Sequence, residues 1–287
     1  KLALDDKVAI RLPGFAPTSL DKKILARRNR VTIRHLLLHT SGLPGWKPLY
    51  RTCKSYRKLL NAILPTALEA EPGSRYRYSD LGFILLGEIA ARAGRKPIAR
   101  LEKELVFAPL GMKETRRNPS STLKKRIPPT EFDEEKGSYI HGKVHDENAR
   151  AAGGITGHAG LFSTTSDLSL LARELLLALK GKSRKFRQKT IEGFVRCQDS
   201  PKGSSRALGW DTPSEESSAG DLASRTSFGH TGFTGTSIWI DPQRDLYIIL
   251  LSNRVHPTRK NRKITAVRRK FADAVVGAID SAGKKAR

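Results

Sequence analysis

The chain of 287 residues is predicted to have an α+β fold, in which a mainly helical part precedes an antiparallel sheet and a final helix. Three observations support this prediction. From Ile33 to about Arg206, apolar residues recur mainly at helical spacing. From Leu208 the pattern changes to short apolar runs, which are typical of strands. In the last segment, Ile264 to Ile279, helical spacing returns, and we expect this helix to pack on the sheet.

Five helices are expected within the helical part, and two of them carry recognisable end signals. Ser79 or Asp80 can cap the third helix, and Gly94 supplies its stop. The fifth helix is expected to be capped by Ser166 and closed by Gly181. The expected ranges are Thr32–His39, Ser55–Ile63, Asp80–Ala93, Ile98–Phe107 and Asp167–Leu179.

Two irregular stretches lie outside these helices. Residues 1–30 are expected to form a connector that ends in a basic run. Residues 118–163 form a long stretch with proline and glycine, and loops of that length are usually functional or disordered. We expect the glycine-rich end of this stretch to line a cleft.

The clearest strand signal lies between residues 228 and 251. The runs Ser237–Ile240 and Leu246–Leu251 are apolar, and Asp241-Pro242 between them is typical of a turn with proline at its second position. They predict a β-hairpin whose first strand carries the polar edge His230-Thr231-Gly232. Glycine inside a strand often marks the close approach of a ligand, so this edge is a candidate binding site.

Four segments, taken in chain order, resemble the motifs of one enzyme superfamily. Tyr78-Ser79-Asp80 looks like a Tyr-x-Asn motif, and His230-Thr231-Gly232 looks like the histidine variant of Lys-Thr-Gly. The other two are the stretch around His39-Thr40-Ser41-Gly42 and the glycine-rich residues 153–164. Together they resemble the serine β-lactamase and penicillin-binding-protein superfamily, in its class C-like branch. That branch includes DD-peptidases, D-aminopeptidases and family VIII-type esterases.

The resemblance implies a β-lactamase/transpeptidase-like fold in a single domain. The connector would be 1–30, the mainly helical subdomain 31–206, and the sheet with its C-terminal helix 207–287. The implied activity is serine acyl hydrolysis through an acyl-enzyme, as in an esterase, a DD-peptidase-like enzyme or a β-lactamase. The implied substrates are small esters, amides or peptidoglycan-like compounds, and no cofactor is implied.

The resemblance also assigns roles to residues of the two strongest motifs. Tyr78 is the implied base, or part of the base system, and His230 is the second catalytic residue. The N–H of Phe233 is implied as one donor to the oxyanion that forms in acyl transfer. The binding residues carried over are Asp80, Thr231, Gly232 and Phe233.

The family's nucleophile is the serine of a Ser-x-x-Lys motif that opens a helix. The start of this chain, Lys1 to Val8, resembles the stretch just after that helix. We therefore expect a chain truncated at its N-terminus, without the first strands and the nucleophile, and inactive by itself. Four internal Ser-x-x-Lys matches begin at Ser19, Ser55, Ser121 and Ser281. Ser55 is the best placed of them, but the family has a peripheral segment there.

Two departures from the family's pattern affect the expected chemistry. A phenol titrates near pH 10, so a neutral-pH base needs a pKa lower by about 3 units. His230 replaces a lysine and is only partly charged near neutrality. Asp80, where the family often has asparagine, is expected to raise the pKa of Tyr78 unless a cation pairs with it. Both departures fit ester or D-amino-acid peptide substrates better than β-lactams.

Composition limits the remaining possibilities. The 53 Lys+Arg and 28 Asp+Glu residues give a net charge of +25, which could neutralise phosphates. Because the basic clusters are dispersed and no nucleic-acid-binding motif accompanies them, we expect a basic solvated surface and no nucleic-acid partner. The clusters are Lys22 to Arg34, Lys113 to Arg126, Lys180 to Lys189 and Arg254 to Lys270.

Further features argue against other site types. No apolar run approaches the roughly 18 residues of a membrane span. Cys53 and Cys197 have no metal-binding or redox spacing. Asp146 and Glu147 have no second ligand cluster beside them in sequence, so no metal site is expected, and His39, His145 and His158 are expected to be structural. The alternatives are a non-catalytic module for peptidoglycan-like or acyl ligands and a basic nucleic-acid-associated protein; the compartment is not indicated.

Overall fold

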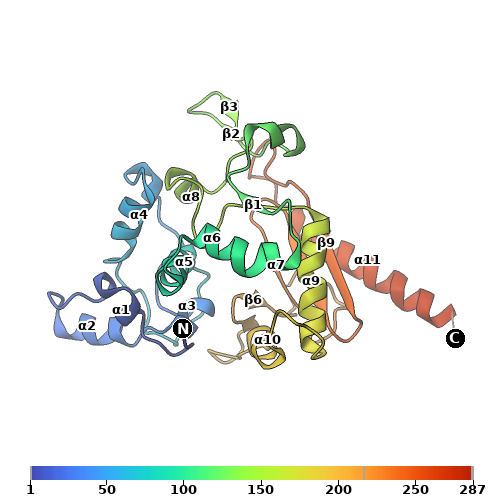
Figure 1. Cartoon of the computed structure of the whole chain (residues 1–287), viewed down its shortest axis with the longest axis horizontal. Coiled ribbons are helices and arrows are strands. Elements are labelled where there is room, and N and C mark those ends of the chain that lie inside the picture. Colours follow the sequence, from blue (N-terminus) through green and yellow to red (C-terminus); the bar gives the residue numbers. More distant parts are fainter. Residues whose placement is uncertain (1, 216, 286–287) are drawn as a thin grey trace.

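The computed structural model describes residues 2–215 and 217–285 and has a helical part beside a sheet (Figure 1). The helical part begins with α1 (Val8–Arg11), α2 (Lys22–Asn29), α3 (Ile33–Leu37), α4 (Tyr56–Ile63) and α5 (Asp80–Gly94), with short 3-10 turns η1 (Pro13–Phe15) and η2 (Leu49–Arg51) between them. α5 is central because its buried residues pack on α1, α3 and α4. Leu81, Ile84, Leu85 and Ile89 form this buried stripe at helical spacing.

The segment expected as a connector differs from the prediction. It contains α1, η1 and α2, and its apolar side chains Val8, Leu12 and Phe15 are buried in the helical core. These elements are short, so each carries too few apolar positions for a periodic signal. The segment is therefore part of the core that supports α5.

A winding middle section joins the helical part to the sheet. It contains α6 (Ile98–Glu102), the π-helical turn η3 (Lys103–Phe107), α7 (Ala108–Leu110), the 3-10 turn η4 (Ser121–Arg126) and α8 (Glu147–Ala151). Two small antiparallel strand pairs belong to it: β1 (Arg116–Arg117) with β4 (Leu161–Phe162), and β2 (Phe132–Asp133) with β3 (Ser138–Tyr139). The expected helix Ile98–Phe107 is thus present and continues to Leu110.

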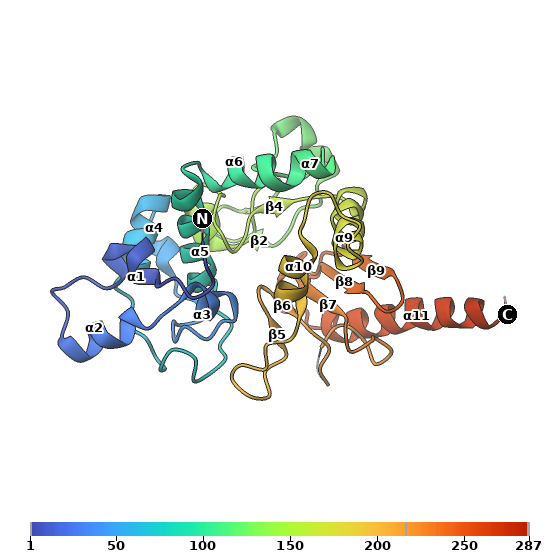
Figure 2. The same ribbon diagram turned by 60° about the horizontal axis from the view of Figure 1, so that its bottom comes forward.

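The sheet has five antiparallel strands in sequence order: β5 (Arg206–Ala207), β6 (Trp210–Asp211), β7 (Phe228–Thr231), β8 (Ser237–Asp241) and β9 (Leu246–Leu250). Two helices before it, α9 (Thr165–Leu179) and α10 (Gln188–Val195), share a buried cluster with Phe228 and Ile240. The final helix, α11 (Ile264–Lys285), contacts β9 and extends outward from the sheet (Figure 2). The expected packing of this helix on the sheet is confirmed.

Two details of the sequence prediction are corrected. The residues His230 and Thr231 end a separate strand, β7, and are not on the first strand of the hairpin with β9. The chain turns between them and β8, where Gly235 has φ +124°, a conformation that favours glycine. The cap of α9 is Thr164, whose side chain accepts from the N–H of Asp167, and not Ser166.

The start of α5 is confirmed with Ser79 as its cap, and the helix ends at Gly94, although its left-handed C-cap residue is Arg95. Among the described residues, no helix is both long enough and apolar enough to cross a membrane.

Candidate active site

The structure brings Tyr78 and His230 together although 151 positions lie between them in the sequence. Their ring centroids are 6.1 Å apart. Tyr78 precedes α5 of the helical part, and His230 lies on β7 of the sheet. The two strongest sequence motifs therefore meet where the helical part faces the sheet.

Local capping explains the placement of Tyr78. The hydroxyl of Ser79 accepts from the N–H of Gly82 at 3.2 Å and donates to the carbonyl of Pro44 at 2.7 Å. Ser79 thereby begins α5 and ties it to the loop after α3. A Cβ at Gly45 would lie 2.9 Å from the carbonyl oxygen of Tyr78, so this loop approaches the tyrosine closely.

The ring of His39 packs against that of Tyr78. The sequence predicted a structural role for His39 but did not single it out as a neighbour of Tyr78. Its ring lies 4.3 Å from that of Tyr78 and is stacked at 4.8 Å on that of Phe83. Its Nδ1 accepts from the N–H of Ser79 at 2.9 Å. Burial lowers the pKa of His39 to about 3, with Arg206 adding to the effect, so the ring is a neutral acceptor. The His-Thr-Ser-Gly motif was the available signal for this residue.

Arg206 is the second residue of the site that the sequence did not single out. Its guanidinium lies 5.8 Å from the ring centre of Tyr78 and 5.1 Å from that of Tyr76. It also forms an ion pair with Asp211 at 3.7 Å. Because β5 is only two residues long, no strand pattern marks Arg206 as facing a cleft.

The pKa of Tyr78 is the main electrostatic feature of the site. Burial and, to a smaller extent, the charge of Asp80 raise the pKa of Tyr78 to about 12, although Arg206 opposes the rise. Tyr78 is 43% exposed, so solvent reaches part of the residue. Asp80 raises the pKa of Tyr78, as expected from the sequence. Tyr78 is therefore a neutral phenol at pH 7.

His230 is also neutral. Burial lowers its pKa, and Arg206 lowers it further. Its Nδ1 lies 2.9 Å from the carbonyl oxygen of Thr231, so Nδ1 is the protonated nitrogen and Nε2 can accept a hydrogen bond. A neutral His230 contributes less positive field to Tyr78 than a lysine would.

Phe233 follows the turn that ends β7. The N–H of Gly232 donates to the carbonyl of Thr236 at 2.7 Å, and Arg268 donates to the carbonyl of Gly232 at 2.7 Å. Within the described part of the chain, the N–H of Phe233 has no hydrogen-bond acceptor. It is therefore free to donate to a bound oxygen.

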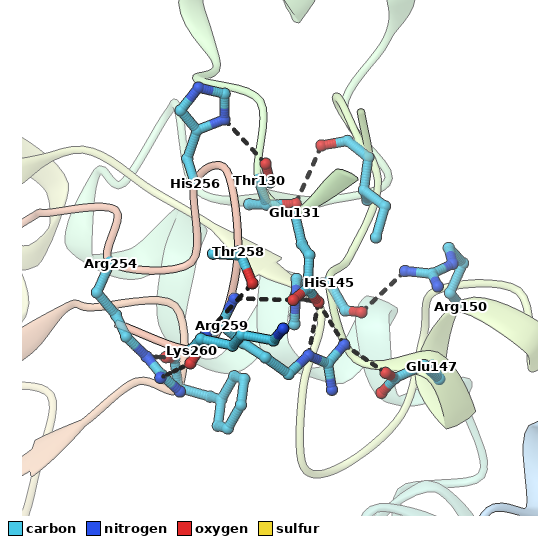
Figure 3. A network of polar contacts seen from close by, with 12 residues as sticks. Thr130, Glu131, His145, Glu147, Arg150, Arg254, His256, Thr258, Arg259 and Lys260 are labelled. Carbon is cyan, nitrogen blue, oxygen red and sulfur yellow. Dashed lines mark hydrogen bonds and ion pairs between the residues drawn. The ribbon is translucent and has the colours of Figure 1, made fainter. Parts of the chain in front are cut away.

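Phe233 contacts Arg254 and His145, which belong to the group of polar residues that Figure 3 shows around Glu131 and Arg259. Arg254 donates to its carbonyl at 2.8 Å and lies 4.2 Å from its ring centre, while His145 stacks on the ring at 5.5 Å. Arg259 donates to Glu131 and to Glu147, each at 2.6 Å. This network connects the segment after β9 to α8 and therefore fixes the turn that carries Phe233.

The internal Ser-x-x-Lys pairs lie elsewhere. Ser55 caps α4 and accepts from the N–H of Lys58, Ser121 begins η4, and Ser281 lies near the end of α11. Ser19 lies in the turn before α2. The recorded ring contacts of Tyr78 are with His39, His230 and Arg206 and involve none of these serines.

The family is decided by comparison of the whole chain. The family model named Beta-lactamase matches residues 1–273. The chain belongs to the β-lactamase family. A "Putative D-alanyl-D-alanine carboxypeptidase" of Salmonella typhimurium is 34% identical to this family member over 292 residues, which cover 92% of the chain and 66% of the relative. The chain thus spans just under two thirds of the length of the curated relatives it matches.

Solved structures agree on the fold. EstCE1, described as a hydrolase with promiscuous acyltransferase activity, has a TM-score of 0.70 at 21% identity. The match covers 96% of this β-lactamase-family chain and 78% of the EstCE1 chain. A simvastatin synthase variant from Aspergillus terreus has a TM-score of 0.69 at 19% identity, with 98% and 76% covered. A β-lactamase from Mycobacterium bovis has a TM-score of 0.59 at 22% identity, with 97% and 87% covered. At these identities the likeness establishes the β-lactamase/transpeptidase-like α+β fold, which confirms the sequence prediction.

Proposed function

We propose that this chain forms the base and oxyanion side of a serine acyl hydrolase cleft. The nucleophile would come from the family's Ser-x-x-Lys helix, because none of the four internal Ser-x-x-Lys matches in these 287 residues is recorded in contact with Tyr78. The observation that carries the proposal is the 6.1 Å separation of the Tyr78 and His230 rings, and the free N–H of Phe233 follows His230 by three residues in the chain. Tyr78 comes from the helical part and His230 from the sheet. Packing of helices or strands alone gives no reason for these two motifs to meet.

The proposed reaction uses these groups in order. The serine oxygen attacks the acyl carbon while its proton passes toward Tyr78, and the N–H of Phe233 donates to the oxygen that becomes negative. The leaving group takes a proton as the acyl-enzyme forms, and water then releases the acid. Arg206 and a further cation would be needed to lower the pKa of Tyr78 enough for it to accept a proton at pH 7.

The proposed substrates are peptides that end in D-amino acids, or small esters. The carboxypeptidase description of the Salmonella relative supports the first class, and EstCE1 supports ester chemistry on the same fold. The neutral His230 and the carboxylate of Asp80 make β-lactams the less suitable class.

The first experiment uses the chain as it is. A labelled penicillin or a fluorophosphonate probe is expected to leave no covalent adduct, as read by intact-protein mass spectrometry. A stoichiometric adduct on Ser55 would contradict the assignment of the nucleophile. A diacetyl-Lys-D-Ala-D-Ala peptide is expected to shift the NMR signals of His230 and the Phe233 amide; unchanged signals at millimolar peptide would contradict the cleft.

The base assignment is tested in a protein where this chain is joined to a Ser-x-x-Lys helix. We expect Tyr78→Phe to lower kcat at least about 100-fold, the scale of general base catalysis, with an unchanged circular dichroism spectrum. Tyr139→Phe, an exposed tyrosine on β3, is the matched control. A Tyr78→Phe protein with the parent kcat would remove Tyr78 from the mechanism.

The second candidate is a non-catalytic module that binds peptidoglycan-like or acyl ligands. The observation that favours it is the pKa of Tyr78, which is raised to about 12 and is unsuited to a base. Peptide binding without any turnover in the joined protein would support this candidate over the hydrolase.

A further inference from the structure

Three metal-ligating side chains from separate segments meet beside the start of α5. Asp80 is the first residue of α5, Asp146 caps α8, and His158 lies in the glycine-rich loop before β4. One ligand atom from each lies within 4.8 Å of the other two, and all three residues are half-buried. The Nε2 of His158 is 2.9 Å from Oδ1 of Asp146.

Tertiary packing explains why these residues meet. The glycine-rich loop lies against α5, and a Cβ added at Gly87 would be 2.8 Å from the Cα of Gly157. The following residue, His158, is thereby directed to the start of α5. The sequence offered no second ligand group near Asp146, because its partners lie on a helix and a loop that only folding brings to it.

Two of the three side chains, those of Asp146 and His158, are held by hydrogen bonds in a way that suits a ligand. Oδ1 of Asp146 accepts from the N–H of Ala149 at 2.7 Å, which fixes the carboxylate. The Nδ1 of His158 lies 3.0 Å from the hydroxyl of the buried Thr156, so a second partner orients the ring. The His158 side chain is only 3% exposed, and its Nε2 is directed toward the carboxylates.

The charges around the cluster are unusual for this chain. Among the described residues, the carboxylate of Asp80 has no hydrogen bond and no ion pair, and Asp146 pairs only with His158. Yet the chain contains 53 lysines and arginines. Two half-buried carboxylates without a lysine or arginine partner leave a local deficit of positive charge.

We propose that Asp80, Asp146 and His158 form a binding site for a divalent transition-metal ion, with Zn²⁺ as the best fit. One imidazole and two carboxylates are a donor set that zinc accepts, and three protein ligands leave one position open for water. Calcium and magnesium fit less well because they prefer oxygen ligands alone. The proposed hydrolase function does not require this ion, so the two proposals can fail separately.

The test measures zinc directly. The full chain, in a Cys197→Ser background because that exposed thiol can bind zinc, is stripped with EDTA and titrated with Zn²⁺ at pH 7. We expect one tight equivalent by calorimetry and by elemental analysis after dialysis, and no comparable binding of Mg²⁺. Substitution by Co²⁺ is expected to give visible absorption bands that disappear in His158→Gln.

The variants are chosen to keep the fold. Asp146→Asn retains an acceptor for the cap of α8, and Asp80→Asn leaves the Ser79 cap of α5 intact. We expect each of these and His158→Gln to weaken zinc binding about 100-fold or more. Thr156→Val is expected to weaken zinc binding about 10-fold, the usual effect of removing a side chain that hydrogen-bonds to a metal ligand. Asp133→Asn is the control and is expected to bind zinc like the parent; Asp133 lies on β2 and its carboxylate pairs with Lys136.

Circular dichroism and thermal unfolding in EDTA establish that each variant is folded before its affinity is compared. Absence of a stoichiometric zinc site in the parent would overturn the proposal. So would zinc binding that is unchanged in all three folded ligand variants, because the ion would then be bound elsewhere.

Discussion

Arg206 affects several titrating groups of the site at once. It opposes the rise in the pKa of Tyr78 and lowers the pKa values of His39 and His230. Its side chain is only 16% exposed, so its charge is poorly screened by solvent. A single cation at this position favours both a phenolate and a neutral imidazole.

We expect Arg206→Gln to raise the pKa of His230, because a positive charge near the ring is removed. Burial is the larger cause of the lowered pKa and remains, so the value should stay below that of an exposed histidine. An NMR titration of the histidine ring protons measures the change. Arg92→Gln, which alters an ion pair with Glu88 on the surface of α5, is the control. An identical His230 titration in Arg206→Gln would contradict this electrostatic role.

Asp80 should make the stability of the apo protein depend on pH. Burial and, to a smaller extent, the charge of Asp146 raise the pKa of Asp80 to about 6, although His158 opposes the rise. The folded state therefore holds the proton more tightly than the unfolded state, so stability falls as the pH rises from about 4 through 6. A shift of about two units corresponds to about 3 kcal/mol.

We therefore expect Asp80→Asn to raise the free energy of unfolding by up to about 3 kcal/mol at pH 8 and to change it little at pH 4. Urea unfolding with EDTA present measures both values. Ser79 remains as the helix cap, so the substitution does not alter the start of α5. An equal effect at the two pH values would show that the charge of Asp80 is not the cause.

At the scale of elements, the start of α9 shows how a cap was misassigned. Ser166 and Thr164 are both acceptable caps in sequence, and both precede an apolar stripe. In the structure Thr164 has extended backbone geometry and accepts from the N–H of Asp167 at 3.2 Å. Asp167 is then buried and accepts from the N–H groups of Glu114 and Thr115, which connect α9 to the segment between α7 and β1.

We expect Thr164→Ala to lower the free energy of unfolding by about 1 kcal/mol, the usual cost of losing a cap. Ser166→Ala is the matched control, because Ser166 is exposed within the first turn and should change stability by less than about 0.5 kcal/mol. Urea unfolding of both variants measures the difference. Equal losses of stability in the two variants would contradict the assignment of Thr164 as the cap.

At the scale of the whole molecule, the network around Glu131 connects segments that are far apart in sequence. Burial opposes ionisation of Glu131, but hydrogen bonds from Arg259 and His145 lower its pKa to about 2. The folded pKa is thus below the unfolded value, so this stabilisation is complete above about pH 4.5 and is lost as the pH falls toward 2. Phe233 depends on this network for its position.

We expect Glu131→Gln to lower the free energy of unfolding by about 3 kcal/mol at pH 7 and by progressively less as the pH is lowered below 4.5. Glu135→Gln is the control, because Glu135 is an exposed residue of the turn between β2 and β3, and the substitution removes the same charge. Denaturant unfolding between pH 7 and 3 measures the trend, and the amide signal of Phe233 reports the turn. A pH-independent loss would contradict the ionic explanation.

Local patterns in the sequence were sufficient for the helices α4, α5, α9 and α11, for the hairpin of β8 and β9, and for the candidate residues Tyr78 and His230. These features depend on apolar spacing, caps and short motifs that act within a few residues. The tertiary structure alone decided that His39 lies beneath Tyr78, that Arg206 faces it, and that Asp80, Asp146 and His158 meet. Such contacts join side chains from distant segments, and no periodicity within a segment specifies which distant surface it will pack against.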